Sequence, residues 1–175
     1  MRRLLALGSV LAAVYSLCRL LGLWRVRLWV ARAADGLPDA VCPPHLRVLA
    51  PPDEEYAGVW SVSPADARRR LTEEFDFAPL WRAYFHAHAR GDRRRYEVGS
   101  FVRRPEGRLG DWQLHVRLFP ADGGTGVWAH WERNPYVAPL AHLREEGYDP
   151  AEGRRRIRGD LGSARLERAV PETAD

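Results

Sequence analysis

The sequence predicts an α+β domain that follows an N-terminal membrane helix. Three observations predict it: an apolar run close to the N-terminus, four successive segments in which apolar and polar residues alternate, and helix-capping residues on both sides of those segments. Alternation with a period of two is typical of antiparallel strands that bury one face. We therefore expect a meander of about four to five strands, with one helix before it and two helices after it.

The N-terminal segment of residues 1–34 carries six arginines and no aspartate or glutamate. Its apolar run, residues 4–24, is long enough at ~1.5 Å per residue to cross a hydrocarbon core of ~30 Å. Arg19 interrupts this run, but it lies close enough to the end for its guanidinium to reach the lipid headgroups. Trp24 and Trp29 suit an interfacial aromatic belt. The sequence therefore predicts a single-pass membrane anchor over residues 1–34 that contacts the bilayer through residues 4–24.

Two alternatives for this segment stay open. Arg2 and Arg3, followed by an apolar stretch, resemble a cleavable signal peptide, although the small residues at 31–33 lie far from that stretch. Arg25 and Arg27 alternate with apolar neighbours, which is also compatible with a helix that lies in the membrane plane or is buried in protein. The arginines on either side of the apolar run slightly favour a cytoplasmic location for the rest of the chain.

The charge of the chain argues against nucleic-acid binding. The net charge is +4, but the N-terminal segment contributes six positive charges, which leaves 21 basic against 23 acidic residues in the remainder. A nucleic-acid-binding domain needs a positive surface, so we expect no such partner. All basic residues are arginine, and the arginine-rich triplets are best explained as solvated surface. The two cysteines show no metal-binding spacing.

Residues 35–54 are predicted to form a linker, because five prolines within them prevent a continuous helix. Residues 56–62 then have the composition of a strand. The following helix begins at Ser63-Pro64, where the serine is the N-cap and the proline takes the first helical position. We expect this helix to end near Phe75.

Four alternating segments follow this helix and are separated by turn residues. They are residues 80–90, 94–103, 112–119 and 126–133. Two helices come next: one over residues 138–146 with Gly147 as its C-cap, and one that begins at the capping box of residues 149–152. The soluble α+β domain is therefore predicted over residues 55–161, before a flexible tail over residues 162–175.

The alternation sorts the strand residues onto two faces of the sheet. One face is apolar and is the expected core. The other face carries four of the six histidines, together with carboxylates and aromatic residues. A tight hairpin in the first strand pair opposes His86 and Glu97, and one register that satisfies the alternation places Gly99, His115 and His130 in a single row.

This second face has three interpretations. It can hold a metal such as zinc, because imidazole and carboxylate groups are zinc ligands, although no local spacing resembles a zinc motif. The candidate metal ligands are His86, His88, Glu97, His115, His130 and Glu132. It can instead bind a ligand without a metal, and the candidates for that role are Trp128, Phe101 and Arg117. In the favoured interpretation the C-terminal helices cover this face, and its histidines pair with carboxylates and arginines at the edge.

The functional prediction that follows is an accessory or binding module that is anchored in the membrane and has neither catalytic residues nor a cofactor. The sequence has no phosphate-binding glycine loop, no nucleophile elbow and no paired cysteine–histidine signature. The alternative is a hydrolase that depends on a metal, with zinc as the cofactor, or on a general-base pair such as His130 and Glu132. No motif indicates whether the partner is a protein or a small molecule.

Overall fold

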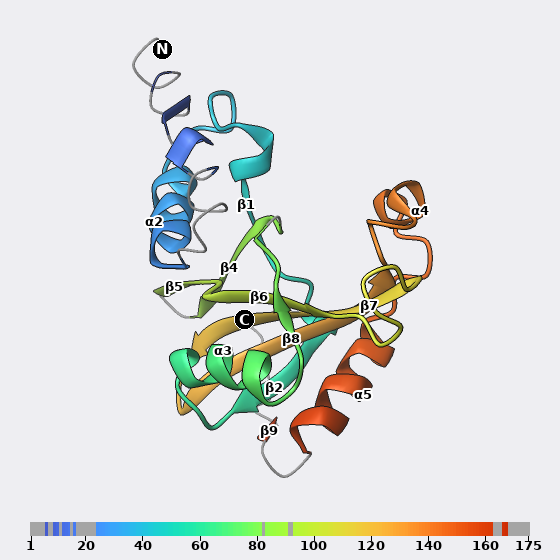
Figure 1. The fold of residues 1–175 in the computed structure, drawn as a ribbon. Coiled ribbons are helices and arrows are strands. Elements are labelled where there is room, and N and C mark those ends of the chain that lie inside the picture. Colours follow the sequence, from blue (N-terminus) through green and yellow to red (C-terminus); the bar gives the residue numbers. More distant parts are fainter. Residues whose placement is uncertain are drawn as a thin grey trace. The chain divides into compact units, whose positions relative to one another are not determined.

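The computed structural model describes residues 6, 9, 10, 12–14, 16, 24–81, 83–90, 93–162, 166 and 167. These residues form helices and two sheets, which are labelled in Figure 1, and the α+β class predicted from the sequence is confirmed. They divide into two compact units. Unit 1 contains the described residues of 1–51 and 81–98, and unit 2 contains those of 52–80 and 99–175.

Unit 1 consists of helix α2 (Trp24–Asp35), a short turn η1 (Pro44–Leu46) and a three-stranded sheet. The strands are β1 (Val48–Leu49), β4 (Phe85–Arg90) and β5 (Arg93–Tyr96). β1 is parallel to β4, and β5 is antiparallel to it. The hairpin register predicted for β4 and β5 is confirmed, since Ala87 lies opposite Tyr96 and the Glu97 amide donates to the His86 carbonyl over 2.8 Å.

Helix α2 occupies the last part of the predicted membrane anchor. Its Arg27 is only 2% exposed, and Nη2 of this residue donates to Oε1 of Glu97 over 2.9 Å and to the carbonyl of Tyr84 over 3.1 Å. Its guanidinium also lies 4.5 Å from the ring centre of Phe85. A buried arginine needs such a carboxylate partner inside a protein, so residues 24–34 fit the alternative of a helix buried in protein.

Most of the predicted apolar run lies outside the described residues. Among the residues that are described, no helix is both long enough and apolar enough to cross a bilayer. The single-pass anchor therefore stays a prediction. The predicted linker contributes to the core of unit 1, where Cys42 and Leu46 are buried with Val30 and Phe85.

Removing the hydrogen bond between Tyr96 and Asp35 tests how firmly α2 is held within unit 1. The Tyr96 hydroxyl donates to Oδ2 of Asp35 over 2.7 Å, and a hydrogen bond to a charged group contributes about 1.5–3 kcal/mol. We expect Tyr96→Phe to lower the free energy of unfolding of unit 1 by about 1.5 kcal/mol, measured by hydrogen exchange of peptides from α2. Tyr84→Phe, at an exposed position, is the matched control. An equal loss in both variants would show that the hydrogen bond does not hold the helix.

Unit 2 is built on a six-stranded sheet in which every neighbouring pair is antiparallel, with the order β3-β6-β7-β8-β2-β9. Its strands are β2 (Tyr56–Trp60), β3 (Ala78–Pro79), β6 (Gly99–Arg103), β7 (Trp112–Ala121), β8 (Gly124–Arg133) and β9 (Leu166–Glu167). β7 and β8 are the two longest strands and pair over their whole length. This central hairpin carries the candidate site.

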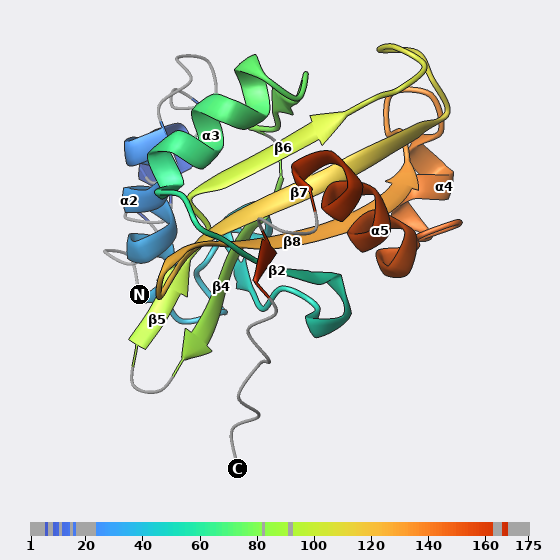
Figure 2. The same cartoon turned by 90° about the horizontal axis from the view of Figure 1, so that it is seen from below.

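The helices of unit 2 lie where helices were predicted. They are α3 (Pro64–Glu73), α4 (Pro139–Leu143) and α5 (Pro150–Leu161), and a short turn η2 (Asp53–Glu55) precedes β2. The helix predicted over residues 138–146 is shorter than expected: it ends at Leu143 with Arg144 as its C-cap, so the predicted C-cap at Gly147 is wrong. Both predicted N-caps form: the side chain of Ser63 accepts from the Asp66 amide over 3.1 Å, and that of Asp149 accepts from the Glu152 amide over 2.9 Å. Figures 1 and 2 show that α3 and α5 lie on the same face of the sheet.

Helix α5 covers the apolar face of the sheet. The Arg156 guanidinium lies 3.9 Å from the ring centre of Trp131, and Arg103 pairs with Asp160 over 2.6 Å. Trp131 and Arg103 stand on either side of Leu114 in one row of this face. The interpretation that placed the C-terminal helices on the histidine face is therefore wrong for α5, because the buried stripe of this helix is apolar and packs best against an apolar surface. The stripe consists of Gly153, Ile157 and Leu161.

The strand predicted over residues 94–103 is broken after Tyr96. Its first part is β5 in unit 1 and its last part is β6 in unit 2, so the strands do not form one continuous meander. The residues between β5 and β6 reset the alternation of side chains. Gly99 consequently pairs with Leu118 rather than with His115, and the predicted row is wrong at this position. The β6 residues opposite Arg117 and His115 are Ser100 and Val102.

Candidate histidine–carboxylate site

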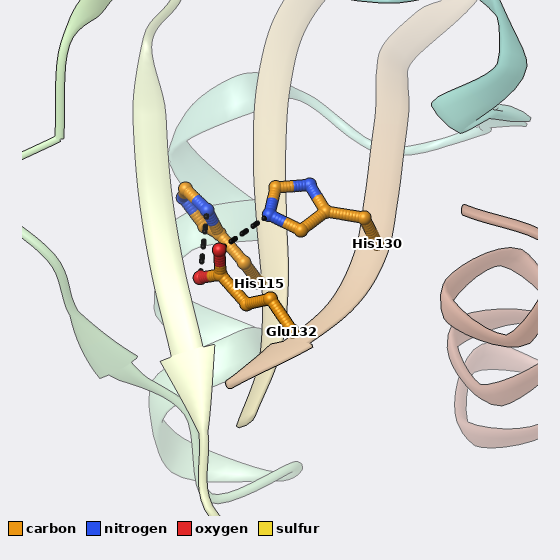
Figure 3. Close-up of side chains that lie close together, drawn as sticks. All are labelled: His115, His130 and Glu132. Carbon is orange, nitrogen blue, oxygen red and sulfur yellow. Dashed lines mark ion pairs between the residues drawn. The ribbon is translucent and has the colours of Figure 1, made fainter. Parts of the chain in front are cut away.

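Three of the predicted metal ligands converge on one face of the sheet in unit 2 (Figure 3). His115 on β7 lies directly opposite His130 on β8, as predicted, and Glu132 projects from the same face because it lies two residues further along β8. Nε2 of His130 is 3.1 Å from Oε2 of Glu132, and Nδ1 of His115 is 3.6 Å from Oε1 of Glu132. The residues are 5%, 3% and 8% exposed in chain order. One possible ligand atom from each lies within 4.8 Å of the others.

Each member of this cluster has a further hydrogen-bond partner. Oγ of Ser100 lies 2.8 Å from Nε2 of His115, and Nε2 of Gln113 donates to Oε1 of Glu132 over 2.6 Å. His142 on α4 places its Nδ1 3.2 Å from Oε2 of Glu132, and its side chain is 32% exposed. Both oxygens of the Glu132 carboxylate are therefore fixed by neighbouring side chains.

A second carboxylate, that of Glu55 at the end of η2, holds the opposite side of His130. Its Oε1 lies 2.8 Å from Nδ1 of His130 and accepts a hydrogen bond from the Tyr148 hydroxyl over 2.7 Å. Its Oε2 pairs with Nη1 of Arg117. Glu55 is 1% exposed, so protein groups rather than water neutralise its charge. His130 thus has a carboxylate on each ring nitrogen.

The charges in this site depend on one another. Burial opposes the ionisation of Glu55, but the hydrogen bond to His130 and the charge of Arg117 outweigh it and lower the pKa of Glu55 to about 2. Burial likewise opposes the protonation of His130, yet its hydrogen bonds to Glu132 and Glu55 raise its pKa. For Glu132, burial is again outweighed, and the hydrogen bond to His130 lowers the pKa. The pKa shifts therefore favour ionised carboxylates at Glu55 and Glu132 and a proton on His130 between them.

The cluster is chemically suited to two tasks. Two imidazoles and one carboxylate form a ligand set that zinc accepts in proteins, and a histidine–carboxylate pair can move a proton. His115, His130 and Glu132 are the residues able to hold a metal. Because each of them is at least nine-tenths buried, an ion or a water molecule can reach them more readily than a large substrate can.

The other predicted metal ligands lie in unit 1. His86 and His88 are on β4, and Nδ1 of His86 is 3.2 Å from Oε2 of Glu97. Glu97 also pairs with Arg27, so a guanidinium already supplies a positive charge beside this carboxylate. The six predicted ligands therefore separate into two groups, one in each unit.

Two of the predicted ligand-binding residues are buried side chains. Trp128 is 7% exposed and packs edge-on against Phe119, while Phe101 is 1% exposed and lies opposite Val116 on the apolar face. Neither ring offers an exposed stacking surface. Arg117, the third candidate, is engaged in the buried ion pair with the η2 carboxylate.

Several partners of the site were not singled out from the sequence. They are Glu55, Ser100, Gln113, His142 and Tyr148. The sequence could have identified Gln113, because it lies two residues before His115 on the same alternating strand and therefore on the same face. Glu55 and Tyr148 belong to turns, where no periodicity gives the direction of a side chain.

Comparisons with known proteins do not identify this site. No protein-family model, curated protein or solved structure matches the chain. Its function is therefore inferred from the residues and the geometry described above.

Proposed function

We propose that the chain is an accessory or binding module, attached to a membrane and without catalytic activity, that acts through an apolar surface around α4. The observation that carries the proposal is a group of large apolar side chains that are 42–78% exposed. We call them the α4 surface, and they are Leu109, Tyr136, Val137, Leu140 and Leu143. Single exposed apolar residues are common, whereas a group of them marks an interaction site.

Contacts join two of the segments that carry the α4 surface. Nδ2 of Asn134 donates to the Arg108 carbonyl over 3.0 Å, which ties the loop carrying Leu109 to the segment carrying Tyr136. The guanidinium groups of Arg104 and Arg108 lie 5.0 and 5.5 Å from the ring centre of Tyr136. Tyrosine and arginine are enriched in protein–protein interfaces. This composition favours a protein partner.

Membrane attachment is supported by the sequence of residues 4–24. The run is predominantly apolar, has Arg19 as its one charged residue and is flanked by arginines on both sides. A tether of this kind raises the effective concentration of the α4 surface for a partner in the same membrane. We therefore propose a membrane protein as the partner, with the soluble part of the chain on the cytoplasmic side.

The second candidate function is a hydrolase that depends on a metal or on a histidine–glutamate pair. The convergence of His115, His130 and Glu132 favours it. Their burial favours the binding module, because a substrate would have to reach side chains that are almost inaccessible. An ester or phosphoester hydrolysis that His130→Ala abolishes would establish the second candidate.

The binding module is tested by photocrosslinking of the full-length chain in isolated membranes. A photoreactive amino acid at Leu143 should form a discrete adduct with a membrane protein, because this side chain is 77% exposed on the α4 surface. The same group at Arg155, which is exposed on α5, is the matched control and should form none. The chain should also remain in the membrane pellet after an alkaline wash. A soluble chain, or equal crosslinking from both positions, would refute the proposal.

A further inference from the structure

We propose that His115, His130 and Glu132 bind one zinc ion through three protein ligands, which leaves a fourth coordination position for water or a small ligand. The inference does not rest on the proposed binding function, because it concerns buried side chains of the sheet in unit 2 rather than the exposed α4 surface. It is carried by the spacing of the three side chains and by the groups that hold the two histidine rings in place.

The spacing of the possible ligand atoms fits a tetrahedral ion. Zinc bonds to nitrogen and oxygen are about 2.0–2.2 Å long, so neighbouring ligand atoms in a tetrahedron lie roughly 3.4 Å apart. The separation of Nε2 of His130 from Oε2 of Glu132 is 3.1 Å, and that of Nδ1 of His115 from Oε1 of Glu132 is 3.6 Å. Both values lie within a few tenths of an ångström of the tetrahedral spacing. With one ligand atom from each residue, all three atoms lie within 4.8 Å of one another, so an ion needs side-chain rotations that bring the most widely separated pair together.

The outer partners hold each histidine by the ring nitrogen that the metal does not need. Glu55 lies at Nδ1 of His130, which leaves Nε2 directed at Glu132. Ser100 lies at Nε2 of His115, which leaves Nδ1 directed at the same carboxylate. Metal-binding histidines almost always have a partner of this kind on the other ring nitrogen, because it fixes the tautomer and the ring orientation. Both histidines here have one.

The carboxylate of Glu132 supplies a negative charge for a metal ion. Nε2 of His130 lies 3.1 Å from Oε2 of Glu132, and zinc bound between these groups would displace any proton that they share, which leaves to solvent. Arg117 pairs with Glu55, whereas the described side chains that hold the Glu132 carboxylate are His115, His130, His142 and Gln113.

The histidine–carboxylate pair of unit 1 provides an internal contrast. There Nδ1 of His86 also approaches a glutamate, Glu97, over 3.2 Å. Arg27 donates to that carboxylate over 2.9 Å, and the buried guanidinium supplies the cation that a metal would otherwise be. We therefore place the metal in unit 2 and expect none at His86.

The test uses the full-length chain, stripped with a chelator and titrated with zinc alone. Elemental mass spectrometry after dialysis should find one equivalent of zinc per chain, and cobalt(II) in its place should show the intense visible bands of a four-coordinate ion. His115→Ala and Glu132→Gln should each abolish this binding. His45→Ala, which removes a histidine from an exposed turn of unit 1, is the matched control and should retain one equivalent.

A second variant keeps the test decisive if removal of a ligand unfolds the chain. Ser100→Ala removes only the hydroxyl that lies against Nε2 of His115, and it should weaken zinc binding about 10–100-fold while the fold is retained. A wild-type chain that binds no zinc, or zinc retained at full affinity by Ser100→Ala and by Glu132→Gln, would overturn the site. Neither result bears on crosslinking from the α4 surface, so the two proposals can fail separately.

Discussion

Replacing Gly153 by alanine is expected to destabilise unit 2 by about 3 kcal/mol, the upper end of the usual cost of overpacking a core. A Cβ atom at this position would fall against the backbone of His130, with the amide nitrogen and the carbonyl carbon both 2.6 Å away. His130 lies on β8, which is paired on both sides within the sheet, so its backbone cannot move aside. Helix α5 must therefore shift outwards and lose part of the packing of Ile157 and Leu161.

Gly159 on the same helix is the matched control. No atom lies within 4 Å of a Cβ at this position, so Gly159→Ala should stabilise the protein by about 1 kcal/mol through helix propensity alone. Urea unfolding, with hydrogen exchange of β8 peptides as a readout specific to unit 2, measures both variants. Opposite signs are expected. The same sign in both would mean that α5 does not pack against the backbone of β8.

The central hairpin shows how much of the site the sequence can predict. Between residues 112 and 133 two alternating segments flank a short turn, and a slip of one residue would move every apolar side chain to the wrong face. The alternation therefore restricts the possible registers, and the one chosen among them places His115 opposite His130, as the structure does. Glu132 follows from the same periodicity. This part of the candidate site needed no knowledge of the rest of the fold.

The remainder of the site depends on contacts that no local pattern encodes. The alternation of residues 94–103 continues through the point where the chain passes from β5 to β6, so Ser100 could not be assigned to the histidine face. Glu55 directly follows the predicted proline-rich linker of residues 35–54, where no periodicity gives the direction of its side chain, yet its carboxylate is the partner of His130 and Arg117. A turn residue acquires such a role only through tertiary packing.

Replacing Glu55 by alanine is expected to destabilise unit 2 by about 3–5 kcal/mol, the usual consequence of removing one partner of a buried ion pair. The substitution leaves Arg117 and Nδ1 of His130 buried without the carboxylate that they share, and Tyr148 loses its hydrogen-bond acceptor. Glu54→Ala is the matched control, because Glu54 is the exposed neighbour in the same turn. It should change stability by no more than about 0.5 kcal/mol.

The effect of Glu55→Ala should depend on pH in a direction set by the pKa of the carboxyl group. Folding lowers this pKa from 4.5 to about 2, and a carboxylate with a lowered pKa contributes its full stabilisation above the unfolded value and loses it as the pH falls towards the folded value. In the presence of a chelator, the difference between wild type and Glu55→Ala should therefore be largest above a pH of about 5 and should shrink between 4.5 and about 2. Urea unfolding at several pH values measures it. If the difference in free energy of unfolding stays constant over this range, Glu55 stabilises the protein through packing. If the difference declines as expected, the ionised carboxylate of Glu55 stabilises the packing of η2 against the sheet.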